Sequence, residues 1–312
     1  MSQAPDFSGT YTALVTPFRS GKLDLGSFGQ LLATQEELEG VVIGGTTGES
    51  PTLDEGEWET LIREAQRQRK NPKLRIIAGT GSNVTTQAIR RTELAERLGV
   101  EAILVVTPYY NKPSQEGLFR HFSAIAAVTR RPILLYSVPS RCGIEIAVET
   151  VARLREAHPH IVGIKEASEQ CSRVDGLRAA LGEDFSILSG NDALTLPFMA
   201  LGANGVISVA SNLCPHPIRS LVRSLLRGDI ARARLLHQAL SPLFHHLFIE
   251  SNPAPIKQLL ARQRLIASGE LRLPLVALAP AHAQALENTF ADFLGASEKL
   301  PELRPNGFDP RP

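Results

Sequence analysis

Eight short runs of apolar, largely β-branched residues recur along the chain, and this repetition limits its fold more than any other feature. Segments with helical apolar spacing separate the runs. Strands that are apolar on both faces and alternate with helices favour a parallel sheet. Eight such units predict an α/β protein with a closed (β/α)8 TIM barrel. The runs cover residues 11–18, 40–45, 74–81, 101–110, 132–139, 161–168, 185–192 and 205–212.

An open, doubly wound sheet is the competing architecture. It would need fewer units and usually a Gly-rich phosphate turn after the first strand. Residues 16–24 supply no such turn, and no GxGxxG or Walker sequence occurs elsewhere. The helical segments have recognisable beginnings as well as periodicity. In segment 52–69, Thr52 and Glu55 predict a capping box, and an apolar helical face follows it.

The strand pattern ends near residue 229. We therefore expect the barrel to occupy residues 1–229 and a C-terminal helical extension to occupy residues 230–300. Helices are predicted over 231–250, 253–268 and 279–295. The last segment, 301–312, is rich in proline and is expected to be loose.

Composition narrows the possible partners and location. The chain has 33 basic and 32 acidic residues, a net charge of +1, which predicts neither a nucleic-acid nor a membrane partner. No apolar run is long enough to span a bilayer, and the first ten residues lack the pattern of a signal peptide. Three scattered cysteines without a CxxC pair fit a reducing cytoplasm and no metal site.

Lys165 follows four apolar residues in the sixth run. With a period of two, Ile161, Gly163 and Lys165 share one face of a strand. If that face points into the barrel, Gly163 leaves room beside the amine. Desolvation lowers the pKa of an amine and leaves it nucleophilic, so that it forms Schiff bases with ketones. A lysine that points outward, or one in a structural ion pair, fits the pattern equally well, because periodicity does not determine the register.

Other polar residues fall where strands end, which is where the active sites of such barrels lie. Tyr136 could relay a proton, or it could be an ordinary core tyrosine. The segment 44–50, GGTTGES, offers backbone N–H groups and hydroxyls to a carboxylate or a small phosphate, or forms a plain turn. Arg141 could bind a carboxylate with two hydrogen bonds, or lie on the surface.

Five sequence motifs, taken together, indicate a protein family more specifically than any one of them does. GTTGES, TPYYNKPSQEGL, YSVPSR, GIKEAS and GVISVASN occur in this order between GTYTALVTPF, which begins at Gly9, and NPAPIKQLL, which ends at Leu260. In order and spacing they resemble the dihydrodipicolinate synthase/N-acetylneuraminate lyase superfamily of class I aldolases. YSVPSR is similar to the pattern of the synthases within this superfamily. The sialic acid lyases usually lack an arginine at the position of Arg141.

The resemblance implies a (β/α)8 barrel that forms a homodimer or homotetramer and needs no cofactor, since a lysine imine carries the chemistry. Pyruvate would be the first substrate and aspartate-4-semialdehyde the second. Lys165 would form the imine and Tyr136 would donate and accept protons. Thr46 and Tyr110 would complete the relay, with Tyr110 reaching across a dimer interface. The implied substrate contacts are made by Thr47, Arg141, Gly190 and the backbone at Ile207.

Two departures bear on the second substrate. Ser137 replaces the usual asparagine after the strand-five tyrosine, and Cys142 replaces the threonine after the arginine. Another pyruvate aldolase of the superfamily therefore stays open as an alternative, acting on 2-keto-3-deoxy sugar acids, 4-hydroxy-2-oxoglutarate or N-acetylneuraminate. A hypothesis from a different functional class is a non-catalytic barrel that binds a keto acid or serves as a scaffold. It predicts the loss of at least one of Lys165, Tyr136, Thr46 or Tyr110, and all four are present.

A third departure concerns feedback by lysine. Feedback-sensitive members of the superfamily have a carboxylate at the position of Gln87 and histidines at those of Glu55 and Trp58, whereas Asn83 and Tyr109 match the pattern. The missing carboxylate would pair with the α-ammonium of lysine. We therefore predict little or no inhibition by lysine at physiological concentrations.

Overall fold

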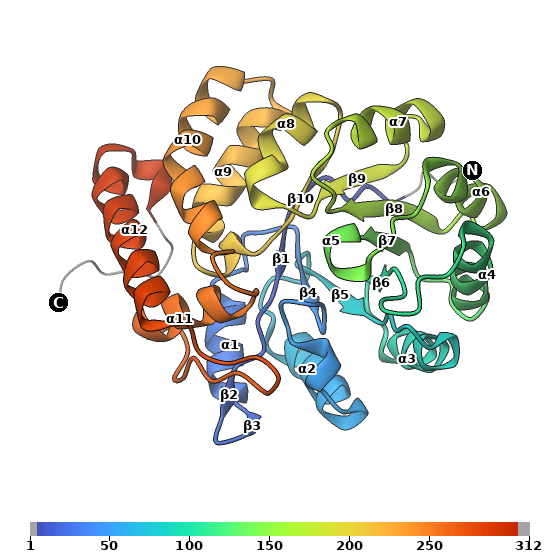
Figure 1. Cartoon of the computed structure of the whole chain (residues 1–312), viewed down its shortest axis with the longest axis horizontal. Coiled ribbons are helices and arrows are strands. Elements are labelled where there is room, and N and C mark those ends of the chain that lie inside the picture. The colour runs from blue at the N-terminus through green and yellow to red at the C-terminus, as the bar shows by residue number, and fades with distance from the viewer. Residues whose placement is uncertain (1–4, 305–312) are drawn as a thin grey trace.

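Eight parallel strands close into a barrel in a computed structural model of the chain, which describes residues 5–304 (Figure 1). The order around the barrel is β1-β10-β9-β8-β7-β6-β5-β4, closed by the pairing of β4 with β1. Each predicted apolar run contributes one strand, so the predicted TIM barrel is confirmed. The strands are β1 (Gly9–Ala13), β4 (Gly40–Ile43), β5 (Arg75–Gly79), β6 (Ala102–Val106), β7 (Ile133–Ser137), β8 (Ile161–Glu166), β9 (Ser186–Ser189) and β10 (Gly205–Ser208).

Helices between successive strands pack their apolar faces on the outside of the barrel. In α2, for example, Trp58, Leu61, Ile62 and Ala65 are buried at helical spacing. The outer core lies between these faces and the strands, and a smaller apolar cluster fills the lumen. The helices up to the last strand connection are α1 (Leu25–Ala33), α2 (Glu55–Gln68), α3 (Thr85–Leu98), α4 (Gln115–Ala126), α5 (Pro139–Cys142), α6 (Val148–Ala157), α7 (Ser172–Leu181), α8 (Thr195–Ala200) and α9 (Pro215–Leu226).

Two local predictions in the first third of the chain were wrong. The capping box of α2 is formed by Asp54 and Glu57, each side chain accepting from the backbone N–H of the other. Thr52 ends a 3-10 turn before the helix, so the box lies two residues later than predicted. The first run also ends its strand at Ala13, and a small hairpin of β2 (Phe18–Arg19) and β3 (Lys22–Leu23) follows it.

Strand β8 contains an irregularity that determines which side chains face the lumen. Ile133 of β7 pairs with Ile161, but the next residue of β7 pairs with Gly163, so Val162 is an extra residue on β8. Val162 consequently joins the luminal cluster, and Ile161 joins the outer core. The prediction that Ile161 shares the face of Lys165 was therefore wrong, whereas Lys165 does turn inward, beside Tyr136.

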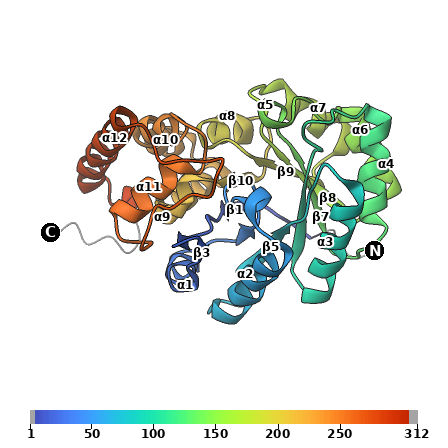
Figure 2. The ribbon, with the colours of Figure 1, turned by 60° about the horizontal axis from the view of Figure 1, so that its bottom comes forward.

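After α9 the chain forms helices that belong to no strand–helix unit. They are α10 (Ile230–His246), α11 (Ala254–Arg262) and α12 (Pro280–Lys299), followed by the 3-10 turn η4 (Pro301–Leu303). Figures 1 and 2 show them gathered at one flank of the barrel next to α9. Residues 230–304 are called the C-terminal region below. Leu303 is buried, so this part of the predicted loose tail is packed, while residues 305–312 lie outside the described residues.

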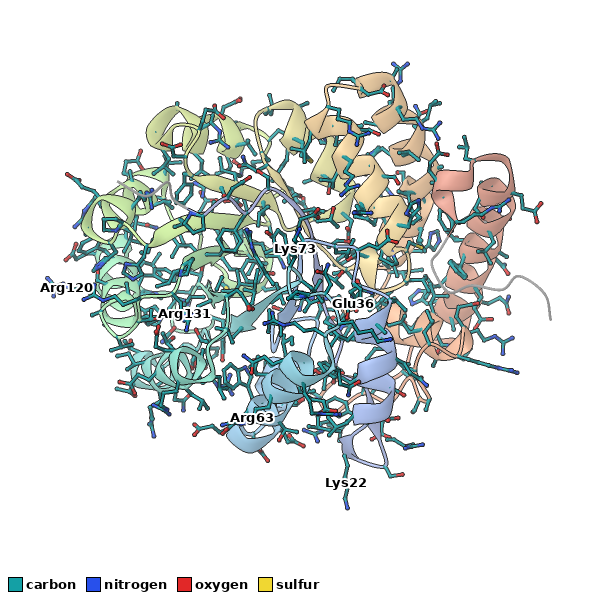
Figure 3. All side chains as sticks on the ribbon, turned by 180° about the vertical axis from the view of Figure 1, so that it is seen from behind. Lys22, Glu36, Arg63, Lys73, Arg120 and Arg131 are labelled. Atoms are coloured by element: carbon teal, nitrogen blue, oxygen red, sulfur yellow. The ribbon has the colours of Figure 1, made fainter. Side chains whose placement is uncertain are left out.

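Most cationic side chains project from the surface, as Lys22, Arg63 and Arg120 do in Figure 3. Two lysines differ sharply from them, because Lys165 is 5% exposed and Lys257 is 0% exposed. Along residues 5–304, none of the helices combines the length and apolarity needed to cross a membrane.

Candidate active site

The amine of Lys165 lies within the barrel near the carboxyl end of β8. Its Nζ is 4.3 Å from the centre of the Tyr136 ring, which comes from the neighbouring strand β7 at the paired position. Among residues 5–304, none gives this amine a hydrogen bond or an ion-pair partner. A buried lysine without a partner is rare unless its reactivity is used. The site therefore offers a nucleophilic amine with a phenol beside it.

Space beside the amine comes from Gly190, at the end of β9. A Cβ on Gly190 would lie 3.0 Å from Cε of Lys165 and 2.6 Å from Cβ of Ala167, so a larger residue would press on the lysine. This role was predicted for Gly163, and that prediction was wrong. A Cβ on Gly163 would meet the backbone oxygen of Ser186 at 2.5 Å, so that glycine serves the packing of adjacent strands.

The GGTTGES loop, residues 44–50, supplies hydroxyl groups from the end of β4. Thr47 is buried, and its Oγ1 accepts a hydrogen bond of 2.9 Å from Nδ2 of Asn252. Because Asn252 donates this bond, the hydroxyl proton of Thr47 is free to bond to a ligand. Asn252 lies between α10 and α11 in the C-terminal region, and it was not predicted from the sequence. Its only signal was an Asn-Pro pair before a helical segment.

Arg141 lies on α5, the short helix directly after β7. Its Nη2 donates a long hydrogen bond of 3.4 Å to the backbone oxygen of Asn252. No carboxylate within residues 5–304 pairs with its guanidinium. The cation is therefore available to a carboxylate of a ligand.

Asp192 is a second residue near the amine for which no role was predicted from the sequence. Its carboxylate is buried after β9, and one oxygen accepts from the backbone N–H groups of Val209 and Ala210 at 2.9 and 3.1 Å. Burial raises the pKa of Asp192, and its hydrogen-bond donors together with the charge of Lys165 oppose that rise. An acid three residues after the end of a strand was the signal that could have found it.

Two adjoining cavities open at this end of the barrel. The first, of about 500 Å³, is called the Lys165 cavity and brings together Thr46, Thr47, Tyr136, Arg141, Lys165, Gly190 and Asn252. The second, of about 370 Å³, is called the Arg91 cavity. It shares Thr46, Tyr136 and Arg141 and extends to Ser50, Ser82, Gln87, Arg91 and Tyr109.

Two predicted residues are not part of either cavity. Tyr110 is 90% exposed, with a backbone φ of 73°, and its ring lies at the surface of the single chain. Ile207 of β10 is buried in the luminal cluster and is not among the side chains that line the two cavities. In residues 5–304 no three His, Cys, Asp or Glu side chains are grouped so that they could hold a metal ion. The expectation of a metal-free reaction stays a prediction.

Fold and site together define a class of protein. It is a (β/α)8 barrel whose site, at the carboxyl ends of the strands, is built around a buried amine suited to imine formation.

Comparison with known proteins narrows this class. Residues 6–292 match the model of the dihydrodipicolinate synthetase family, and the chain belongs to that family. It is 45% identical to the 4-hydroxy-tetrahydrodipicolinate synthase of Persephonella marina over 92% of this chain and 98% of that protein. Its structure is similar to that of the 4-hydroxy-tetrahydrodipicolinate synthase of Methylacidiphilum fumariolicum, with a TM-score of 0.93, 51% identity, and coverage of 96% and 99%. The dihydrodipicolinate synthase of Aquifex aeolicus aligns with a TM-score of 0.90 and 41% identity, over 92% of this chain and 98% of that one.

Proposed function

We propose that this protein is a lyase that condenses pyruvate with L-aspartate-4-semialdehyde to 4-hydroxy-tetrahydrodipicolinate, in the biosynthesis of diaminopimelate and lysine. The observation that carries the proposal is the unpartnered, buried amine of Lys165 beside the Tyr136 ring, in a cavity that also holds Arg141. The activity named for relatives 41–46% identical to this chain supports it.

The first half of the reaction is imine chemistry on pyruvate. The amine of Lys165 attacks the ketone carbon and water leaves, which forms an iminium ion. Loss of a methyl proton turns the iminium into an enamine. The enamine carbon then attacks the aldehyde carbon of the second substrate, whose oxygen takes up a proton and becomes the hydroxyl of the product. Tyr136, next to the amine, is the proton donor and acceptor.

The second half closes the ring and frees the enzyme. The amino group of the second substrate attacks the imine carbon, and the Lys165 amine leaves with a proton. One water is released over the whole reaction, in the step that forms the iminium. The covalent lysine imine takes the place of a cofactor, so the proposed reaction uses none.

Substrate binding follows from groups around the amine. Thr47 donates its hydroxyl proton to the pyruvate carboxylate, since Asn252 already donates to its oxygen. The backbone at Ile207 also contacts pyruvate, and Gly190 leaves the space that the substrate needs. Arg141 binds the carboxylate of the semialdehyde, which favours this substrate over the sugar acids and N-acetylneuraminate of related aldolases.

A second copy of the chain completes the proton relay in this proposal. Thr46 lies in the cavity with Tyr136, whereas Tyr110 is exposed and lines neither cavity of the single chain, which supports a role for it in the site of a neighbouring copy. The protein therefore acts as a homodimer or homotetramer. The proposal also places it in the cytoplasm, without nucleic-acid or membrane partners. The division into a barrel (1–229), a helical region (230–300) and a tail (301–312) belongs to the same proposal.

Borohydride reduction in the presence of pyruvate tests the mechanism directly. We expect mass spectrometry to find one reduced pyruvate adduct, on Lys165. No adduct, or an adduct on another lysine, would refute the mechanism. A coupled assay that compares aspartate-semialdehyde with sugar-acid aldehydes tests the second substrate. Faster turnover of a sugar-acid aldehyde would favour the alternative aldolases.

A further inference from the structure

Glu250, a residue of the C-terminal region, lines the Lys165 cavity, and hydrogen bonds fix the position of its carboxylate. It lies between α10 and α11 and is one of the residues that line this cavity. Its Oε1 accepts from the backbone N–H of Ala279 at 2.9 Å and from Nδ1 of His282 at 2.7 Å, both at the beginning of α12. Its Oε2 accepts from no group within residues 5–304. One oxygen therefore orients the carboxylate and leaves the other for a ligand.

The same cavity contains the guanidinium of Arg141, which no carboxylate of the described residues neutralises. A cationic and an anionic residue, neither neutralised by the other, thus line one cavity together with Lys165. A ligand of matching charge pattern carries a carboxylate and an ammonium group. The uncharged hydroxyls of a sugar acid would leave Glu250 without a charged partner.

We propose that Glu250 binds the α-ammonium group of the second substrate while Arg141 binds its carboxylate, so that the cavity selects an α-amino acid aldehyde. This inference rests on the proposed function and assigns to it a specificity-determining residue. Hydrogen bonds from His282 and Ala279 lower the pKa of Glu250, which keeps the carboxylate charged.

Glu169 is the internal control for this assignment. It also lines the Lys165 cavity with a carboxylate, but it is exposed and makes no hydrogen bond or ion pair with residues 5–304. A free glutamate side chain loses conformational entropy when it is fixed on a ligand, and solvent weakens its charge. Glu250 does not bear the same entropic cost, because α12 already holds it.

The experiment compares two aldehydes that differ in the amino group. Aspartate-semialdehyde is the substrate, and succinic semialdehyde, which lacks the amino group, serves as a competitive inhibitor. In Glu250→Gln we expect the KM for aspartate-semialdehyde to rise about ten- to a hundredfold, the range for losing a hydrogen bond to a charged group. The KM for pyruvate and the Ki of succinic semialdehyde should change by less than about twofold. Glu169→Gln should change none of the three constants.

A second variant covers the case in which Glu250→Gln folds poorly. His282→Ala removes one of the two partners that orient Glu250 and leaves the backbone N–H of Ala279, so it should raise the same KM by a smaller factor. The inference is overturned if the two aldehydes lose affinity equally, if neither does, or if Glu169→Gln produces the effect instead. In each of these outcomes wild-type protein still forms its pyruvate adduct and turns over aspartate-semialdehyde. A wild-type protein that does neither refutes the proposed function itself.

Discussion

Two lysines of this chain are buried, and they differ in the hydrogen-bond partners of their amines. The amine of Lys257, on α11, donates to Oε1 of Glu49 at 2.7 Å and to the backbone oxygen of Thr16 at 2.9 Å. That of Lys165 has no such partner among residues 5–304 and contacts the ring of Tyr136. Burial alone therefore does not distinguish a structural lysine from a reactive one. The hydrogen-bond partner of the amine distinguishes them, because an ammonium group paired with a carboxylate is held in that ion pair, whereas an unpaired amine is free to react.

The surroundings of Lys257 show what the paired lysine holds together. Glu49 belongs to the GGTTGES loop, and its second carboxylate oxygen accepts from the backbone N–H of Arg272 at 3.0 Å. The guanidinium of Arg272 in turn pairs with Glu57 of α2 and holds the pKa of Glu57 below its usual range. Burial lowers the pKa of Lys257, and the charge of Glu49 opposes this. The network ties the C-terminal region to the loop that carries Thr47.

The largest effect should come from Lys165→Met. We expect turnover to fall to background and the reduced pyruvate adduct to disappear, because Lys165 is the one lysine among residues 5–304 that lines the cavity. The free energy of unfolding should not fall, since the change removes an unpaired buried amine. Mass spectrometry after borohydride treatment and urea unfolding measure the two quantities. Residual adduct formation would show that Lys165 is not the reactive lysine.

The Tyr136→Phe variant tests the role of the Tyr136 hydroxyl separately from that of the Lys165 amine. It retains the ring that contacts Lys165 and removes the hydroxyl, so the adduct should still form. We expect kcat to fall by about 10²- to 10⁴-fold, the usual contribution of a general acid–base group. Steady-state kinetics and adduct yield are the measurements. Unchanged kcat would make Tyr136 a core residue only.

Lys257→Met tests the other side of the comparison. It leaves the carboxylate of Glu49 buried without its counter-ion, which should reduce the free energy of unfolding by about 3–5 kcal/mol. The double variant Lys257→Met/Glu49→Gln removes both charges and should recover much of that loss. Urea unfolding measures both. Folded Lys257→Met should still form the pyruvate adduct, and loss of the adduct in folded protein would contradict the division of roles.

The smallest effect concerns a third amine, that of free lysine. Gln87, at the position where feedback-sensitive members are expected to have a carboxylate, lines the Arg91 cavity, and no carboxylate of residues 5–304 lines it. The guanidinium of Arg91 donates instead to Ser50 Oγ and to the backbone oxygen of Leu53. An ammonium group would meet a cation there, so initial rates should stay nearly constant as lysine is added. Ordinary inhibition of the wild-type protein would contradict this, and Gln87→Glu should increase sensitivity.

Much of this site could be predicted from the sequence because barrel closure is a simple rule. Lys165 and Tyr136 were each ambiguous alone, but both follow apolar runs, and parallel strands of a barrel present their carboxyl ends at one face. That Thr46 and Arg141 line one cavity with these residues follows from the same rule. Motif order added the expected roles, which local periodicity did not indicate.

What could not be predicted depends on contacts between distant parts of the chain. Asn252 and Thr47 are 205 residues apart, and no local pattern links the loop between two late helices to a barrel strand. Glu250 depends likewise on the first turn of α12. The extra residue Val162 escaped periodicity because a bulge changes the register without changing the apolar character of the run.

By itself, then, the sequence determined the number of strands in the barrel, their parallel alternation with helices, and the set of polar residues at the ends of these strands, since these depend on the local period of apolar residues. Only the tertiary structure decided which buried lysine is free. Lys165 and Lys257 follow similar apolar neighbours, and the difference between them is a glutamate 208 residues away from Lys257 that the packing of the C-terminal region brings within 2.7 Å. Pairing across such a separation is a property of the folded chain, not of any segment of it.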